Sequence, residues 1–133
     1  MKSPLSVLLC EDEVIIALDL KFQLKKMGYL VMGICKSAEE LITRALEIKP
    51  DIIVTDIKLE GNLSGIDAMK AIRRKMDVPF IYLSGQQNVS TYEEALKTKP
   101  CDFIGKPFSS YQLKSAMERC HKSGIGNFLL TLA

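Results

Sequence analysis

Short apolar runs alternate with amphipathic stretches along this 133-residue chain. The five runs are rich in β-branched and aromatic residues and cover residues 7–10, 31–35, 52–55, 80–83 and 103–104. Continuous apolar runs of this length are typical of strands that are buried on both faces of a parallel sheet. The second run is weakened by Gly33, and the fifth is very short. The pattern predicts five strands.

The amphipathic stretches carry helix signals. In four of them a serine is followed, three residues later, by a side chain that can complete a capping box, at residues 37–40, 64–67, 90–93 and 109–112. The serine would accept a hydrogen bond from an orphan N–H, and the later side chain would reach back. The first stretch has an apolar stripe at helical spacing and then a glycine as stop signal. That stripe and its stop are Ile16, Leu20, Leu24, Met27 and Gly28.

Regular alternation of strand and helix predicts an α/β fold. We expect a five-stranded parallel sheet in a (βα)5 arrangement, flavodoxin-like, with helices on both faces in a three-layer sandwich. Residues 1–122 would form one domain. Residues 123–126 (Ser-Gly-Ile-Gly) are expected to end the last helix, which leaves 123–133 as a C-terminal tail or the start of a linker. The apolar residues 128–130 in that tail could begin a linker, pack on the domain or mediate a homodimer.

Composition narrows the class of protein. Hydrophobic residues make up 47 % of the chain and the net charge is +2. This charge is small and dispersed, so it does not predict direct nucleic-acid binding. No segment reaches the roughly 20 consecutive apolar residues of a membrane helix, and the N-terminus has no secretion signal. We therefore expect a cytoplasmic protein without a membrane segment.

The cysteines do not predict a zinc site. Cys10, Cys35, Cys101 and Cys120 show no CxxC spacing, and His121 is the only histidine. A structural zinc site needs four ligands in close local pairs. We expect four small, buried, reduced thiols.

Polar side chains follow four of the predicted strands. Glu11 and Asp12 follow the first strand, Asp56 ends the third, Ser84 follows the fourth and Lys106 follows the fifth. In open parallel sheets, ligands bind beyond the carboxyl ends of the strands. We therefore expect carboxylates, a hydroxyl and an ammonium group to meet at one edge of the sheet.

This set of groups calls for a cation. Two carboxylates about 4 Å apart repel by roughly 4 kcal/mol at an effective dielectric near 20. Hard oxygen ligands without imidazole or thiolate favour Mg²⁺. A carboxylate such as Asp56 can also act as a nucleophile towards phosphorus. Lys106 could then neutralise phosphoryl oxygens, and Ser84 could donate a hydrogen bond to one of them.

Four short motifs in order resemble those of the response-regulator receiver domains of two-component phosphorelay signalling. They are Cys-Glu-Asp-Glu at 10–13, Ile-Val-Thr-Asp-Ile at 53–57, Tyr-Leu-Ser-Gly at 82–85 and Gly-Lys-Pro-Phe at 105–108. Each motif is weak alone, but the resemblance spans residues 6–122 and places each motif at the right element end. It implies the receiver fold.

The resemblance also implies metal and phosphate roles. Asp56 would be the phosphoacceptor. Glu11 and Asp12 would be the Mg²⁺-site acids, with Asp56 as third ligand and the backbone carbonyl of Lys58 as fourth. Lys106 would pair with the phosphate, and a cis bond is expected before Pro107, because a proline amide lowers the cost of the cis form.

Two further residues would carry the switch. By the same resemblance, Ser84 would move to the phosphate and the aromatic ring of Phe103 would then turn inward. Three departures from the family pattern stand out. The acid pair begins with Glu11 instead of Asp, the switch aromatic is Phe instead of the frequent Tyr, and the loop after Asp56 is longer and lacks the usual Met-Pro.

Together these features predict a signalling switch. A histidine kinase or histidine phosphotransfer protein would donate a phosphoryl group to Asp56, and the surface around the fourth helix and fifth strand would change for an unknown output partner. The protein would be no enzyme beyond its own phosphorylation and dephosphorylation. The alternative is a binding module that works without phosphorylation. A flavodoxin-like cofactor binder is disfavoured because the acidic loop after the first strand repels a bare phosphate.

A second apolar row on the first predicted helix has two interpretations. Val14, Leu18 and Phe22 lie at helical spacing directly after the acid cluster. The helix could be buried over a wide arc. Alternatively, this row could be a docking surface for the histidine-bearing phosphodonor.

Overall fold

A computed structural model describes residues 4–85 and 88–132, with side chains described as far as His121. Five strands and five helices alternate along the chain. Their bounds are β1 Ser6–Cys10, α1 Val14–Lys26, β2 Leu30–Cys35, α2 Ala38–Ile48, β3 Ile52–Asp56, α3 Gly65–Arg73, β4 Phe80–Ser84, α4 Val89–Lys97, β5 Asp102–Gly105 and α5 Ser110–Leu132.

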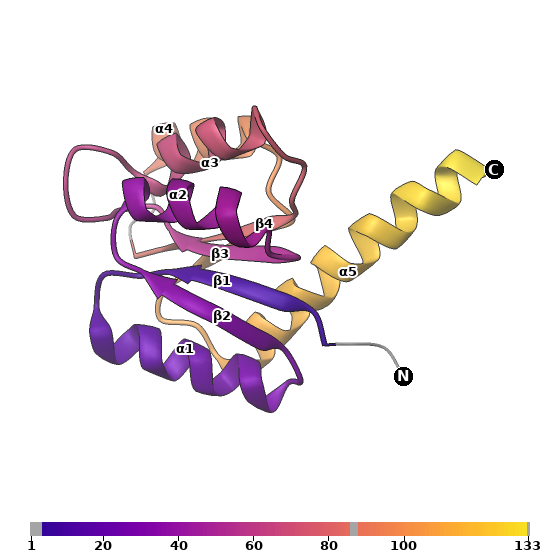
Figure 1. The fold of residues 1–133 in the computed structure, drawn as a ribbon, viewed down its shortest axis with the longest axis horizontal. Helices are drawn as coiled ribbons and strands as arrows, with labels where there is room; N and C mark the ends of the chain where they lie inside the picture. Colours follow the sequence, from indigo (N-terminus) through magenta and orange to yellow (C-terminus); the bar gives the residue numbers. More distant parts are fainter. Residues whose placement is uncertain (1–3, 86–87, 133) are drawn as a thin grey trace.

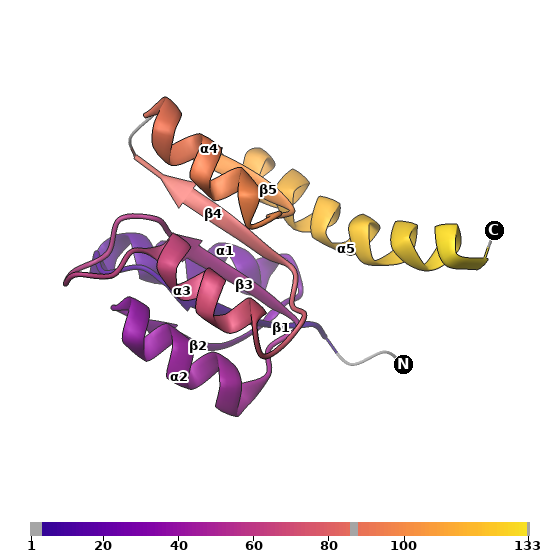
Figure 2. The ribbon, with the colours of Figure 1, turned by 90° about the horizontal axis from the view of Figure 1, so that it is seen from above.

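The strands form one parallel sheet in the order β2-β1-β3-β4-β5. Helices α1 and α5 cover one face and α2, α3 and α4 cover the other (Figures 1 and 2). This is the predicted (βα)5 three-layer sandwich. Strand β2 lies on one side of β1, and β3 lies on the other. The direction in which successive strands are added to the sheet therefore reverses at β1. A crevice at such a reversal is where open α/β sheets bind ligands.

Two apolar clusters hold the layers together, because successive side chains of a strand point to opposite faces. Leu8, Ile53 and Tyr82 pack towards α2, α3 and α4. Leu9 and Val54, on the same strands, pack towards α1 and α5. Every residue of β3 and β4 is buried, which explains why their sequences read as continuous apolar runs.

Burial on both faces was wrong for β2. Leu30 and Met32 are 49 % and 42 % exposed. The physical reason is the position of β2 at the edge of the sheet, where no further strand covers its flank.

Three of the four predicted serine caps are present. Ser64 and Asp67 form a complete capping box, and Ser109 and Gln112 make the same reciprocal pair. Ser37 accepts from the N–H of Glu40, whose carboxylate reaches one residue further back, to the N–H of Lys36.

The predicted cap at Ser90 is wrong. Helix α4 begins at Val89, and the side chain of Asn88 accepts from the N–H groups of Ser90 and Thr91. Asparagine is as good an N-cap as serine, and here it stands two residues earlier in the chain.

The predicted break of the last helix at 123–126 is also wrong. Helix α5 continues to Leu132 and projects beyond the sheet (Figures 1 and 2). Each glycine costs about 1 kcal/mol relative to alanine in a helix, but glycine can still adopt the helical backbone conformation, so the helix continues. The side chains of 128–130 lie outside the described ones, so the interpretations of the tail and the boundary near residue 122 stay predictions. No helix in the described part of the chain joins the length and apolar character needed to cross a membrane.

The four cysteines are free thiols. Cys10, Cys35 and Cys120 are buried as predicted, whereas Cys101, just before β5, is partly exposed. Burial raises the pKa of Cys35 to about 11, so this thiol stays protonated and behaves as a small apolar side chain.

Candidate functional site

The carboxyl ends of β1, β3 and β5 bring three acids and a lysine together. Cys10 of β1 lies beside Thr55 of β3, so the residues that follow them, Glu11 and Asp56, are neighbours. Oxygen atoms of Glu11, Asp12 and Asp56 all lie within 4.8 Å of one another. The strand-end positions in the sequence therefore correspond to one cluster in space.

Lys106 lies between two of these carboxylates. Its Nζ is 2.5 Å from Oε1 of Glu11 and 2.8 Å from Oδ2 of Asp56. The backbone N–H of Lys106 donates to the carbonyl of Ser84 at 2.7 Å, and the Lys106–Pro107 bond is cis, as the resemblance implied. The end of β4 and the turn after β5 thus hold the ammonium group against the acid cluster.

Burial shapes the acidity of the cluster. Glu11 is 1 % exposed and Asp56 is 5 % exposed. Desolvation raises the pKa of Asp56 to about 7, and the charge of Glu11 adds to this, while Lys106 acts in the opposite direction. Near neutral pH, Asp56 is therefore close to its midpoint in the metal-free protein.

The pKa of Glu11 is shifted in the opposite direction, below its usual value. Its burial alone would raise its pKa, but hydrogen bonds from Lys106, Asp56 and the N–H of Glu13 outweigh this and hold the pKa below its usual value. Burial alone would lower the pKa of Lys106, and its bonds to the two carboxylates reverse the sign and raise it. Partial burial, followed by the neighbouring Glu11, raises the pKa of Asp12.

The cluster has the ligands of a hard divalent cation. Its donor atoms are carboxylate oxygens alone, the ligand type that Mg²⁺ and Ca²⁺ prefer. Glu11 and Asp56 already hold the ammonium group of Lys106 between them, so the site favours positive charge. Glu11, Asp12 and Asp56 fit a metal of this class, and Lys58 lines the same cleft two residues after Asp56.

The cluster opens into a cleft of about 600 Å³. Its lining residues are Asp12, Glu13, Asp56, Ile57, Lys58, Leu59, Glu60, Ser64, Ser84, Gly85, Thr91 and Lys106. Ser84 is 6 % exposed and stands at the end of β4, on the wall of the cleft. The cleft therefore gathers every predicted site residue except Glu11, which lies buried behind it, and Phe103.

Phe103 lies in a neighbouring hollow of about 360 Å³, lined by Asn88, Val89, Tyr92, Phe103 and Gly105. Its ring meets the edge of Tyr92 at a centroid distance of 4.9 Å and that of Tyr82 at 6.4 Å. The predicted switch aromatic is thus in contact with α4 but separate from the acid cluster.

Sequence reasoning missed two residues at this site. Thr91, in the first turn of α4, lines the cleft. Gly65 packs behind Asp56, where a Cβ would collide with the Asp56 carbonyl oxygen, and its N–H donates to the carbonyl of Ile57 at 2.7 Å. A glycine directly after the cap Ser64 was the available signal for a close backbone approach.

The fold and the acid cluster define a receiver-type α/β domain. Residues 7–118 match the response regulator receiver domain family. The chain therefore belongs to this family of two-component signalling proteins.

Relatives extend over most of the chain. It is 32 % identical over 115 residues to the transcriptional regulatory protein PdtaR of Mycobacterium tuberculosis, covering 86 % of this chain and 56 % of PdtaR. It is 32 % identical over 117 residues to the chemotaxis protein CheY of Thermotoga maritima, covering 87 % of this chain and 97 % of CheY. The chain thus spans about half the length of PdtaR and nearly all of CheY.

A solved structure shows the same architecture. The signal receiver domain of a modulated diguanylate cyclase from Desulfovibrio desulfuricans superimposes with a TM-score of 0.84 at 30 % identity, covering 92 % of this chain and 98 % of that one. The predicted family and fold are therefore confirmed.

Proposed function

We propose that this domain accepts a phosphoryl group on Asp56 from a phosphohistidine of a histidine kinase or a histidine phosphotransfer protein. The carrying observation is the position of Asp56: its carboxylate stands at the floor of an open cleft, ion-paired with Lys106 and beside two further acids. Membership of the receiver family supports the same role.

The side chains suit an in-line transfer. An oxygen of the Asp56 carboxylate attacks phosphorus, a P–O bond forms, and the P–N bond to the donor histidine breaks, leaving its electron pair on nitrogen. The ammonium group of Lys106, already 2.8 Å from Asp56, would then pair with the negative charge that develops on the phosphoryl oxygens. Ser84 stands on the same wall of the cleft and can donate its hydroxyl to one of these oxygens.

Glu11, Asp12, Asp56 and the backbone carbonyl of Lys58 would hold Mg²⁺. A bound Mg²⁺ would supply Lewis-acid neutralisation of the charge that gathers between phosphoryl and carboxylate oxygens. Without such neutralisation, three carboxylates would repel an incoming phosphate. Burial raises the pKa of Asp56, and the neighbouring Glu11 adds to this, so the ionised carboxylate is costly at this site without a further cation.

The response would pass from the cleft to the α4–β5 surface. Once Ser84 turns to the phosphate, the space it leaves lies at the end of β4, next to β5 in the sheet. Phe103 of β5 then turns inward and loses its contact with Tyr92 of α4. Such a change of packing gives a partner two distinguishable surfaces.

The exposed row on α1 suits the phosphodonor. Val14, Leu18 and Phe22 are 54 %, 55 % and 62 % exposed, so the interpretation as a wide buried arc is wrong for these three. Helix α1 starts beside the cleft, where Glu13 lines the wall. An apolar row at this place would let a helical donor domain present its histidine to Asp56.

The first experiment tests phosphorylation itself. Intact mass is measured after incubation with acetyl phosphate, with and without Mg²⁺, beside Asp56→Asn. We expect the mass of one phosphoryl group, and only when both Mg²⁺ and Asp56 are present. No gain from acetyl phosphate or from a phosphorylated histidine donor, in a folded protein, would favour the phosphorylation-independent binding module.

A second experiment tests donor docking. Leu18→Ala should slow transfer from a phosphohistidine protein about tenfold, because a contact at the centre of an interface is lost. Labelling by acetyl phosphate should not change. Leu96→Ala on α4 is the matched control, since that leucine is 45 % exposed on the other side of the sheet. Equal transfer rates for the two variants would contradict docking at α1.

A further inference from the structure

The ends of α3 and α4 line a second charged hollow, which is shallow and open and lies at the edge of the sheet opposite the acid cluster. Its volume is about 320 Å³. Its lining residues are Lys70, Arg73, Arg74, Lys97, Thr98 and Lys99. Five of these six side chains are cations and none is an acid. No step of the proposed phosphorylation uses them.

Helix ends explain only part of this charge. Cations favour the C-terminal turn of a helix, where the dipole amounts to about half a negative charge. Two helices therefore account for about one of the five cations. Glu94 balances another, through its 2.9 Å ion pair with Lys70. In the part of the chain that the structure describes, Arg74, Lys97 and Lys99 have no ion-pair partner.

The wall of the hollow is held in place. Arg73, the last residue of α3, donates to the backbone carbonyl of Thr98, the C-cap of α4, and its guanidinium lies 6.0 Å from the centre of the Phe80 ring. Lys99 follows with a left-handed backbone, φ 59°. The ends of the two helices are thus joined, and the cations that project from them are gathered before any ligand arrives.

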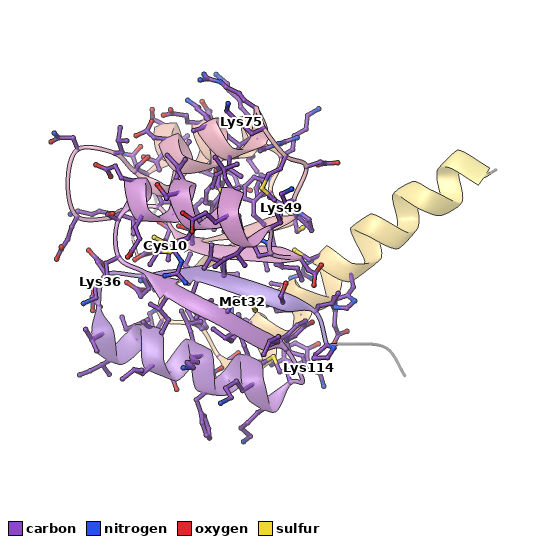
Figure 3. The ribbon with its side chains drawn as sticks, viewed as in Figure 1. Cys10, Met32, Lys36, Lys49, Lys75 and Lys114 are labelled. Carbon is purple, nitrogen blue, oxygen red and sulfur yellow. The ribbon has the colours of Figure 1, made fainter. Side chains whose placement is uncertain are left out.

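More positive charge lies along the same edge. Lys49 caps the C-terminus of α2 and Lys75 follows the end of α3. Figure 3 shows both side chains at this end of the molecule, with Lys36 near the opposite end. These two lysines add positive charge near the hollow, while the exposed acids Asp51 and Asp77 stand at the same edge of the sheet.

We propose that this hollow binds a compact, multiply charged phosphate group, such as the di- or triphosphate chain of an inorganic polyphosphate or a nucleotide. The small extent of the site favours this ligand over a nucleic-acid duplex, since the hollow lies between the ends of only two helices. Arginine forks and lysine ammonium groups together are the usual partners of phosphate oxygens. About three positive charges remain unbalanced and available to phosphate oxygens.

Calorimetric titration with inorganic triphosphate, in the presence of a chelator, tests the proposal. The chelator prevents a metal from carrying the ligand to the acid cluster. Arg74→Gln/Lys97→Gln should weaken binding at least about tenfold. Lys25→Gln/Lys26→Gln is the matched control, because these two cations stand in the last turn of α1, away from the hollow. It should retain wild-type affinity.

Amide chemical shifts locate the site. Triphosphate should move the signals of residues 70–74 and 97–99 and leave those around Asp56 in place. If ATP causes the same shifts as inorganic triphosphate, the site recognises the phosphate chain alone. Larger shifts with ATP would show that the site also contacts the nucleoside. Absence of binding, equal weakening by the control pair, or shifts confined to the acid cluster would overturn the proposal. Lys97→Gln alone serves if the double variant does not fold.

Discussion

At the carboxyl edge of the sheet Lys106 lies between two nearly buried carboxylates, whereas at the opposite edge the Arg119–Asp102 pair is partly exposed to water. The side chain of Lys106 is 15 % exposed, and those of Glu11 and Asp56 are 0 % and 7 % exposed. Arg119 and Asp102 are 55 % and 23 % exposed. Both sites contain short ion pairs, so the difference lies in their surroundings and in the number of acids.

Burial makes the first site costly and chemically useful. Two acids share one ammonium group there, so one negative charge stays uncompensated when both are ionised, and low solvation magnifies that imbalance. At the exposed pair, one cation meets one anion and water screens both. The comparison teaches that the carboxyl edge keeps an electrostatic conflict which a phosphoryl group and a metal can relieve, while the exposed Arg119–Asp102 pair serves stability alone.

Removing the shared cation should have the largest effect on stability. Lys106→Met leaves Glu11 and Asp56 buried without a counter-charge. We expect a loss of about 3 kcal/mol in the free energy of unfolding at about pH 8 without metal, measured by urea denaturation. The loss should shrink towards pH 5, because Asp56 takes up a proton there: its pKa is about 7 in the wild type, and removing Lys106, which lowers it, shifts it upward.

A double variant separates this conflict from simple loss of packing. In an Asp56→Asn background, Lys106→Met should cost much less, since only Glu11 remains charged. Equal losses in the two backgrounds would show that the aliphatic stem of Lys106 matters and the charge balance does not.

Removing one of the acids should instead raise the free energy of unfolding. The pKa of Asp56 is about 7 in the folded protein against 3.8 for an ordinary aspartate, mainly because it is buried. The folded state therefore holds a proton that the unfolded state has lost, and stability falls as pH rises from about 4 to 7. Asp56→Asn should remove this penalty and stabilise the metal-free protein by on the order of 2 kcal/mol at about pH 8.

The pH dependence is the decisive measurement for Asp56→Asn. Its advantage over the wild type should fade as pH falls from about 7 towards 4 and vanish below about 3, where Asp56 is protonated in both states. Mg²⁺ should narrow the gap at about pH 8 by binding to the folded wild type. A variant that is less stable than the wild type at every pH would contradict the conflict at this edge.

The hydrophobic pattern was enough to predict the fold. Fully buried strands such as β3 and β4 have no polar alternation, and helices α2 and α3 begin at the serines that the sequence marked. The exposure of Leu30 and Met32 could not be foreseen, because it depends on the strand order, which local pattern does not encode. The start of α4 and the length of α5 were missed for a smaller reason, since competing local signals differ there by about 1 kcal/mol.

The sequence was enough to predict which residues form the candidate site, but not how their charges and protons are arranged. Position at the strand ends brought Glu11, Asp12, Asp56, Ser84 and Lys106 into one group. The sharing of a proton between Glu11 and Asp56 depends on distances below 5 Å and on burial, which no spacing in the sequence reveals. The basic hollow was missed because its cations come from two helices that seemed, one by one, to carry ordinary helix-end charges.

The smallest predicted effect is at the exposed ion pair. Arg119 donates through Nε and Nη2 to one oxygen of Asp102, at 2.8 and 2.5 Å, and so links α5 to the start of β5. Because water surrounds much of the guanidinium, Arg119→Gln should cost less than about 1 kcal/mol. The loss should be smaller in about 0.5 M salt, which screens an exposed pair. A loss as large as that of Lys106→Met would remove the contrast between the edges, because burial would then no longer decide what an ion pair contributes.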